Sequence, residues 1–123
     1  ERVDLAPILN AEQLLDMQAT VEQVHASEPV ERYIVSLTAA TRQHAYVQIG
    51  ASPRGSLALY QLARAYAMVQ ARDFVLPDDV KAMAPAALAH RLLLKPELWV
   101  RGIQAEHVVR DILEHIPIPK VDM

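Results

Sequence analysis

Apolar residues recur at alternating three- and four-residue steps through most of the chain, which is the spacing of amphipathic helices. This period predicts five helices, at about residues 11–25, 29–44, 52–71, 77–90 and 104–115. No segment shows a convincing alternation of the kind that marks a strand. The pattern therefore predicts an all-α fold, a compact bundle of about five helices.

Each predicted helix has one apolar stripe, and we expect these stripes to meet in a common core. The five stripes are Leu14, Met17, Val21 and Val24; Val30, Tyr33, Ile34, Leu37 and Thr41; Leu59, Leu62, Ala63, Tyr66 and Val69; Val80, Met83, Ala84, Ala87 and Leu88; and Val108, Val109, Ile112 and Leu113.

Local signals sharpen several helix boundaries. Asn10 with Gln13 predicts a capping box at the first helix. The third helix has the clearest start, because Ser52 is a capping residue and Pro53 suits the first helical position. Pro85 lacks the backbone N–H that a helix interior needs, so it should kink the fourth helix or split it in two.

The remaining segments are predicted as connections. Residues 92–100 are typical of an extended or irregular link, with Trp99 anchoring it onto the bundle. Tyr60 and Tyr66 are expected in the core or at its rim, and residues 117–123 form an extended tail.

Composition narrows the class of protein. The 123 residues fit one domain, and 52% of them are apolar. Cysteine is absent, which excludes disulfides and thiol chemistry and fits a cytoplasmic setting. The net charge of −3, without a basic stripe, argues against nucleic-acid binding. No apolar run is long enough to span a membrane, and no signal peptide is visible. The chain opens without Met, which indicates a piece of a longer protein or a trimmed one.

A complete active site is not found in the sequence. There is no phosphate-binding G-x-x-x-x-G-K-[ST] loop, no H-E-x-x-H, no G-x-S-x-G and no dinucleotide fingerprint. The three glycines, Gly50, Gly55 and Gly102, are too few and too scattered for a glycine-rich phosphate loop. The chain by itself is therefore not expected to be an enzyme.

Arg54 is the candidate that local rules do not explain. It falls in the first turn of the third helix, where the helix dipole favours Asp or Glu. A bound anion such as a phosphate would resolve the conflict, because helix N-termini attract anions and arginine offers a fork of donors. The alternative is that Arg54 pairs with a carboxylate or points into water. The residues alone leave both open.

Two further candidates carry weaker signals. His107, Asp111 and His115 recur at four-residue steps, a spacing compatible with metal ligands on one helix face. They are interleaved with an ordinary solvated charge ladder, so no metal site is assigned. Arg64 could border a nucleotide or a neighbouring subunit, but a surface arginine is the favoured interpretation.

Several short motifs occur together in a fixed order, in residues 50–59, 62–67, 72–75, 77–81, 90–92 and 116–119. This combination resembles the C-terminal lid of MoxR-family AAA+ ATPases. The resemblance covers about residues 50–119, with residues 10–44 in the expected helical pattern. Leu76 departs from the family, which often has a Thr or Ser cap there, while Asp78 and Asp79 need no role beyond the helix dipole.

The resemblance implies a site and a division of the chain. Arg54 matches the family's sensor-2 arginine, so it is the implied catalytic residue, and Ser52, Pro53 and Arg54 are the implied nucleotide-binding residues. ATP would be bound with Mg²⁺ held by a separate ATPase core. Residues 1–9 would be a linker from that core, 10–116 the lid and 117–123 the tail. The full-length protein would hydrolyse ATP, and this piece alone would not.

The resemblance also implies partners. These are the protein's own AAA+ core, neighbouring subunits in a ring, commonly a hexamer, and proteins with von Willebrand factor A domains in a chaperone-like assembly role. An apolar patch is then expected near Leu57 and Tyr60, where the core would dock. The alternative is a free-standing helical interaction module that works without nucleotide, and a nucleic-acid reader is placed last.

Overall fold

The computed structural model describes residues 4–120, and the main chain is helical through most of this range. The elements in chain order are α1 (Ala11–Glu22), α2 (Glu28–Gln43), β1 (Val47–Ile49), α3 (Pro53–Val69), α4 (Pro77–Leu88), the 3₁₀ helix η1 (Ala89–Arg91), β2 (Leu93–Leu94), α5 (Pro96–Val100) and α6 (Ala105–His115). The predicted mainly helical fold is confirmed, and a short two-stranded sheet is added to it.

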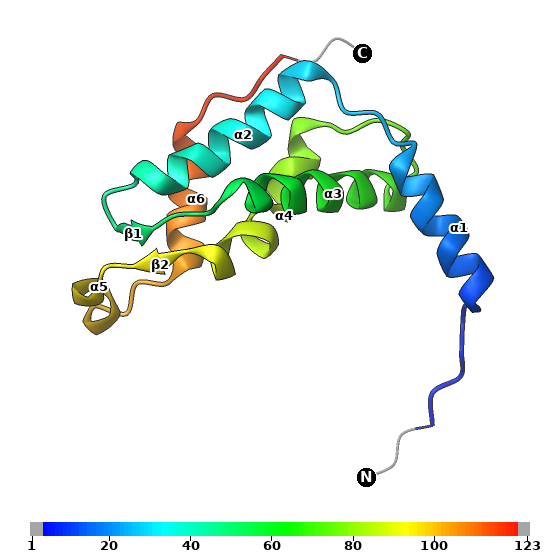
Figure 1. The fold of residues 1–123 in the computed structure, drawn as a ribbon, viewed down its shortest axis with the longest axis horizontal. Coiled ribbons are helices and arrows are strands. Elements are labelled where there is room, and N and C mark those ends of the chain that lie inside the picture. Colours follow the sequence, from blue (N-terminus) through cyan, green and yellow to red (C-terminus); the bar gives the residue numbers. More distant parts are fainter. Residues whose placement is uncertain (1–3, 121–123) are drawn as a thin grey trace.

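Helices α2, α3, α4 and α6 form the body of the molecule, and α1 extends from one end of it (Figure 1). α3 packs chiefly against α4, while α2 packs against α3 and α6. The predicted stripes of α2, α4 and α6 face this core almost completely, with Met83 and Leu113 partly buried at its margin. α4 continues through Pro85 as far as Leu88, so it is not split at the proline.

Two predicted stripes are only partly buried. On α3, Leu59 and Ala63 lie in the core and Tyr66 is half-buried, but Leu62 and Val69 are exposed. The prediction was wrong for the last two because Gly55 and Ala67 face the neighbouring helices instead. α3 therefore presents to its neighbours a face that is rotated from the predicted one.

Helix α1 lies apart from the core. Its predicted capping box is present, since the Gln13 amide donates to Asn10 Oδ1 and the Asn10 amide donates to Gln13 Oε1. No residue of α1 is fully buried, and Leu14 and Met17 are exposed, but α1 contacts α3 and Val21 is partly buried. Val24, the last residue of the predicted stripe, lies in the core just beyond the end of the helix. The predicted linker and tail include residues 1–3 and 121–123, which lie outside the described residues.

The link between the fourth and last helices is more ordered than predicted. Leu93–Leu94 forms strand β2, which pairs antiparallel with β1 through Val47 and Leu94 and through Ile49 and Leu93. After Lys95, residues Pro96–Val100 form helix α5 rather than irregular chain. Trp99, the predicted anchor, is 61% exposed, whereas its neighbour Leu98 is 4% exposed and attaches α5 to the body.

Candidate functional site

The N-terminus of α3 has the predicted cap. Ser52 has extended backbone angles, and its hydroxyl oxygen accepts from the Arg54 amide at 3.3 Å. The Ser52 carbonyl in turn accepts from the Gly55 amide at 2.8 Å, which begins the helix, and Pro53 occupies the first turn. Pro53 has no backbone N–H, and the Arg54 and Gly55 amides are already bonded to Ser52, so the positive end of the helix dipole and the Arg54 side chain remain to attract an anion.

Arg54 lies on this end with its side chain exposed. Among residues 4–120, no carboxylate oxygen lies within 4 Å of its guanidinium, and the first turn of α3 contains no acidic residue. The first structural alternative, pairing with a carboxylate, is therefore not found within this domain. Arg54 presents an uncompensated positive charge next to the helix N-terminus.

The segment before the cap is held by the C-terminal end of α2. The Ala51 amide donates to Thr41 Oγ1 at 2.9 Å, and the guanidinium of Arg42 donates through Nη1 to the Ala51 carbonyl at 2.6 Å. Ala51 is buried. A Cβ placed on Gly50 would come within 2.6 Å of the Arg42 backbone, so only glycine fits this close approach. These two hydrogen bonds, from Thr41 and Arg42 to Ala51, are called the clamp below. The sequence analysis did not predict the clamp, although a threonine within an otherwise apolar stripe was an available signal.

The first turn of α3 is also packed from the other side. A Cβ placed on Gly55 would lie 3.0 Å from the Ala51 side chain, 3.3 Å from Leu88 and 3.5 Å from Arg91. The absence of a side chain at Gly55 thus lets α3 approach the end of α4 and η1. Arg91 lies beside this turn, with its Nε donating to the Ala87 carbonyl at 3.1 Å. The helix end that carries Arg54 is held by α2 and α4 together.

Arg64 is not the surface arginine that was predicted, because it is only 7% exposed. Its guanidinium carbon lies 4.9 Å from the centre of the Tyr60 ring, and Nη1 donates to Gln61 Oε1 at 3.3 Å. The side chain is stacked along α3 and covered by its neighbours, and no contact in residues 4–120 connects it with Arg54. The structure therefore does not bring the two arginines together into one site.

An apolar groove begins one turn beyond Arg54. It has a volume of about 250 Å³ and lies between α2 and α3, lined by Glu31, Ile34, Val35, Ser56, Leu57 and Tyr60. Leu57 is 65% exposed, and Tyr60 is half-buried at the rim of the core. The predicted apolar patch is confirmed here. Because Arg54 and Leu57 are three residues apart, they share one face of α3.

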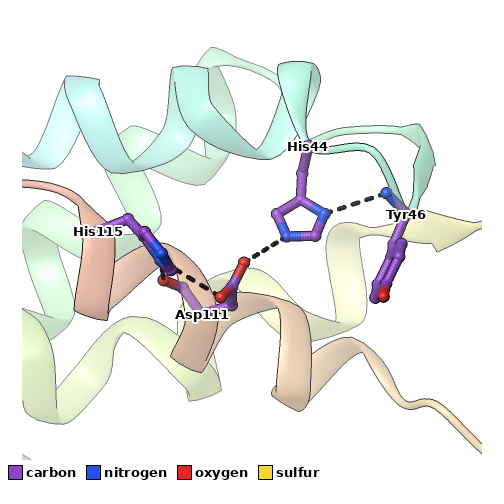
Figure 2. A network of polar contacts seen from close by, with 4 residues as sticks. All are labelled: His44, Tyr46, Asp111 and His115. Atoms are coloured by element: carbon purple, nitrogen blue, oxygen red, sulfur yellow. Dashed lines mark hydrogen bonds and ion pairs between the residues drawn. The ribbon is translucent and has the colours of Figure 1, made fainter.

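Two residues of the predicted metal spacing, Asp111 and His115, contact each other, and Asp111 also contacts His44 (Figure 2). Asp111 Oδ2 lies 2.7 Å from Nε2 of His44, and Asp111 Oδ1 lies 3.3 Å from Nδ1 of His115. The Tyr46 amide donates to His44 Nδ1 at 3.1 Å, so the proton between His44 and Asp111 is carried by Nε2. This network joins the end of α2 to α6.

The other histidine of that spacing, His107, lies at the start of α6, where its Nδ1 accepts from the Gln104 amide at 3.0 Å. Within residues 4–120, no group of three or more His, Asp or Glu side chains has the placement to hold a metal ion.

The two acidic residues in the first turn of α4 have different surroundings. Asp78 is exposed, whereas Asp79 is 1% exposed. The Asp79 carboxylate accepts from the Leu76 amide at 2.7 Å and forms an ion pair with Arg72. Asp79 thus does more than complement the helix dipole.

The fold and the end of α3 together define a class of protein: a small helical domain that presents an arginine on a rigid helix N-terminus beside an apolar groove. The family model of the AAA lid domain matches residues 39–112, a range that contains the clamp, the cap, Arg54 and the groove wall formed by α3. The chain belongs to the AAA lid domain family, in its MoxR branch.

Individual relatives agree with this assignment. The chain is 44% identical to the protein YeaC of Bacillus subtilis, over 94% of this chain and 36% of that protein. It is 32% identical to the chaperone MoxR1 of Mycobacterium tuberculosis, over 94% of this chain and 33% of that protein. A crystal structure of a candidate ATPase from Cytophaga hutchinsonii superposes with a TM-score of 0.84 at 33% identity, over 89% of this chain and 36% of that one. The chain spans about a third of the length of these proteins.

One general property also follows from the described residues. None of the helices within 4–120 is both long enough and apolar enough to cross a membrane.

Proposed function

We propose that this chain is the sensor-2 lid of a longer MoxR-type AAA+ ATPase and that Arg54 contacts the phosphates of ATP bound in the core of that protein. The observation that carries the proposal is the exposed Arg54 guanidinium on the N-terminus of α3, which has no carboxylate partner among residues 4–120. An arginine at this position offers several N–H donors to phosphate oxygens, and the positive end of the α3 dipole adds to the attraction.

Arg54 would act on the charge that builds up during transfer of the γ-phosphate. A guanidinium held near the oxygens of the γ-phosphate would stabilise the transition state more than the ground state. The negative charge on the phosphate groups is redistributed as the bond to the leaving group breaks, and a positive charge fixed in place favours the redistributed arrangement. Ser52 and Pro53 would contribute by setting the start of the helix. Mg²⁺ is assigned to the core, since the described residues offer no set of ligands for it.

The groove beside Arg54 supports a docking role for the same face. Ile34, Val35 and Leu57 form apolar walls, and an AAA+ core that placed a phosphate at Arg54 would also cover Leu57 one turn away. Loss of the γ-phosphate would then weaken one of the contacts that fix the lid and favour its rotation. A ring of such subunits, assembling or maturing other proteins in the manner of a chaperone, completes the proposal.

The test is ATP hydrolysis by the full-length protein carrying Arg54→Ala. We expect turnover to fall on the order of 100-fold, the effect of removing one preorganised donor from a transition state. Arg54→Lys should recover only part of it, because lysine lacks the fork of donors. Arg110→Ala, which changes an exposed arginine on α6, is the matched control and should leave turnover unchanged.

Circular dichroism and gel filtration would establish that the Arg54→Ala protein retains its fold and assembly. Unchanged hydrolysis by that folded protein would overturn the proposal. A free-standing interaction module, gripping its partner through the groove without nucleotide, would then be the better explanation.

A further inference from the structure

A buried hydrogen-bonded chain connects α2 with the start of α3. Thr41 is fully buried, and its hydroxyl donates to the Thr38 carbonyl at 2.6 Å while accepting from the Ala51 amide at 2.9 Å. Both hydrogen-bonding capacities of this hydroxyl are therefore used, one within α2 and one across to the next segment. Because Ala51 immediately precedes Ser52, the position of the helix cap is fixed from α2.

A second link acts on the same residue. The Arg42 guanidinium donates to the Ala51 carbonyl at 2.6 Å. Two consecutive residues of α2 therefore hold Ala51, Thr41 through the amide and Arg42 through the carbonyl. Gly50 lets the two backbones approach closely enough for these bonds to form. The two bonds restrain the two peptide units that flank the Ala51 Cα, Gly50–Ala51 and Ala51–Ser52, and so restrain the direction of the chain as well as its position.

We propose that Thr41 and Arg42 are positioning residues for Arg54, so that α2 and the phosphate-contacting end of α3 move as one rigid body when the lid rotates. This inference rests on the proposed sensor-2 function of Arg54. Neither residue touches the nucleotide in this proposal. Their effect is exerted through the two peptide units that flank Ala51, which set the direction in which the first turn of α3 points.

Loss of the Thr41 hydroxyl has a definite local consequence. Thr41→Val keeps the size of the buried side chain but leaves the Ala51 amide without its acceptor in an enclosed position. The segment would shift or open toward solvent to satisfy that amide, and the end of α3 would move with it. Displacements of about 1 Å at a reacting centre are enough to lower turnover on the order of 100-fold.

The experiment compares Thr41→Val with Thr38→Val in the full-length protein, with kcat, KM and binding of a fluorescent ATP analogue measured for each. Thr38 is a matched control, because it is equally buried on the same helix but its hydroxyl bonds only to the Ile34 carbonyl within α2. We expect Thr41→Val to lower kcat by about 10- to 100-fold with a smaller change in KM. Thr38→Val should stay within about twofold of the parent, and Thr41→Ser, which keeps the hydroxyl, should restore most of the loss.

Two additional variants separate positioning from general damage. Arg42→Gln alters an exposed side chain that lies outside the core, so it tests the second link even where Thr41→Val fails to fold. In the Arg54→Ala background, Thr41→Val should have no further effect on kcat, because residues that act through one another are not additive. Amide exchange at Ala51 should accelerate in Thr41→Val and not in Thr38→Val.

The outcomes distinguish this inference from the function on which it depends. If Arg54→Ala lowers turnover while Thr41→Val and Arg42→Gln match Thr38→Val, the positioning role is wrong and the sensor-2 role stands. If Thr41→Val lowers turnover equally with and without Arg54, the clamp does not work through that arginine, and the positioning role is again overturned. If Arg54→Ala itself has no effect, the proposed function fails first.

Discussion

Asp111 is shared between two histidines, and the two contacts differ in kind. His44 is largely buried and donates to the carboxylate through Nε2, while His115 lies on the surface, with Nδ1 also 2.7 Å from the Asp111 carbonyl (Figure 2). That backbone hydrogen bond is the main reason why the pKa of His115 is raised above its usual value, and the Asp111 carboxylate is the next. The Glu114 charge raises it further.

These contacts predict a partial response to mutation. Asp111→Asn removes the carboxylate but keeps the backbone carbonyl, so the pKa of His115 should fall and yet remain above about 6.5. Glu114→Gln should change it less, because Glu114 is the weakest of the contacts that raise it. Titration of the imidazole signals by NMR measures both shifts. A return to the unperturbed value in Asp111→Asn would contradict the dominant role of the carbonyl.

The direction of the linkage to stability follows from the same shift. A histidine whose pKa is raised by folding contributes stability that is fully present below about pH 6.5, the unfolded value. That contribution is lost as the pH rises through the pKa of folded His115. The protonated form of this surface residue is therefore the one that the folded state favours.

Residue-scale burial also explains the one misassigned arginine. Arg64 was predicted on the surface because arginine is rarely enclosed, but its aliphatic stem and planar head can be covered when an aromatic ring lies against them. Tyr60, one turn earlier on α3, supplies that ring. Because the stacking is local, the four-residue spacing of Tyr60 and Arg64 was a signal available in the sequence.

Helix α4 shows how an element compensates for a poor cap. Leu76 occupies the N-cap, and its side chain has no atom that can accept a hydrogen bond, but the Asp79 carboxylate accepts from the Leu76 amide and so satisfies one group at the helix end. The same carboxylate pairs with Arg72 in the preceding connection. Asp79 thus replaces the missing cap and ties the α3–α4 connection to the helix.

The two neighbouring aspartates should therefore respond very differently to the same substitution. Asp79→Asn leaves Arg72 without its partner at a site where the carboxylate is 1% exposed, so the free energy of unfolding should fall by about 2–4 kcal/mol. Asp78→Asn removes only an exposed charge from the same turn and should lower it by less than about 1 kcal/mol. Urea unfolding of both variants measures the difference. Equal losses would mean that only the helix dipole matters.

At the scale of the whole molecule, the exposed apolar residues are unevenly distributed. Among the described residues they occur on α1 and the segment before it, on α3 and in the groove beside Arg54, and around β2 and α5. Helices α1 and α5 lie at opposite ends of the molecule (Figure 1). The groove is the one that adjoins the proposed phosphate contact. Covering Leu57 would stabilise an assembly with the core by about 1.5–3 kcal/mol.

Leu57→Asp tests that role at the level of domain docking. The isolated chain should keep its stability within about 0.5 kcal/mol, because the side chain is 65% exposed there. The full-length protein should lose stability of the lid against the core and hydrolyse ATP more slowly. Val69→Asp, at the exposed far end of the same helix, is the control and should alter neither. Urea unfolding of both forms, with turnover, measures this; an equal loss in the isolated chain would contradict docking at Leu57.

The sequence by itself determined the features that depend on neighbouring residues. The period of α2, α4 and α6, the capping box of α1 and the Ser52–Pro53 start of α3 are set by interactions within a few residues, and each was predicted with nearly the observed bounds. The position of Arg54 in that first turn followed directly, as did the lid family. These features need no knowledge of what packs against them.

Only the tertiary structure decided the strand pairing, the exposed faces of the helices and the contacts that hold the start of α3, because these features depend on contacts between distant segments. Strands β1 and β2 are too short to show a pattern, and they exist because residues about 45 positions apart pair. The exposure of Leu62, Val69 and Trp99 depends on which face of each helix its neighbours cover. The Thr41–Ala51 hydrogen bond could form only after α2 and α3 had been placed side by side. A helix follows from its own residues, but its buried side and its fixed end follow from its neighbours.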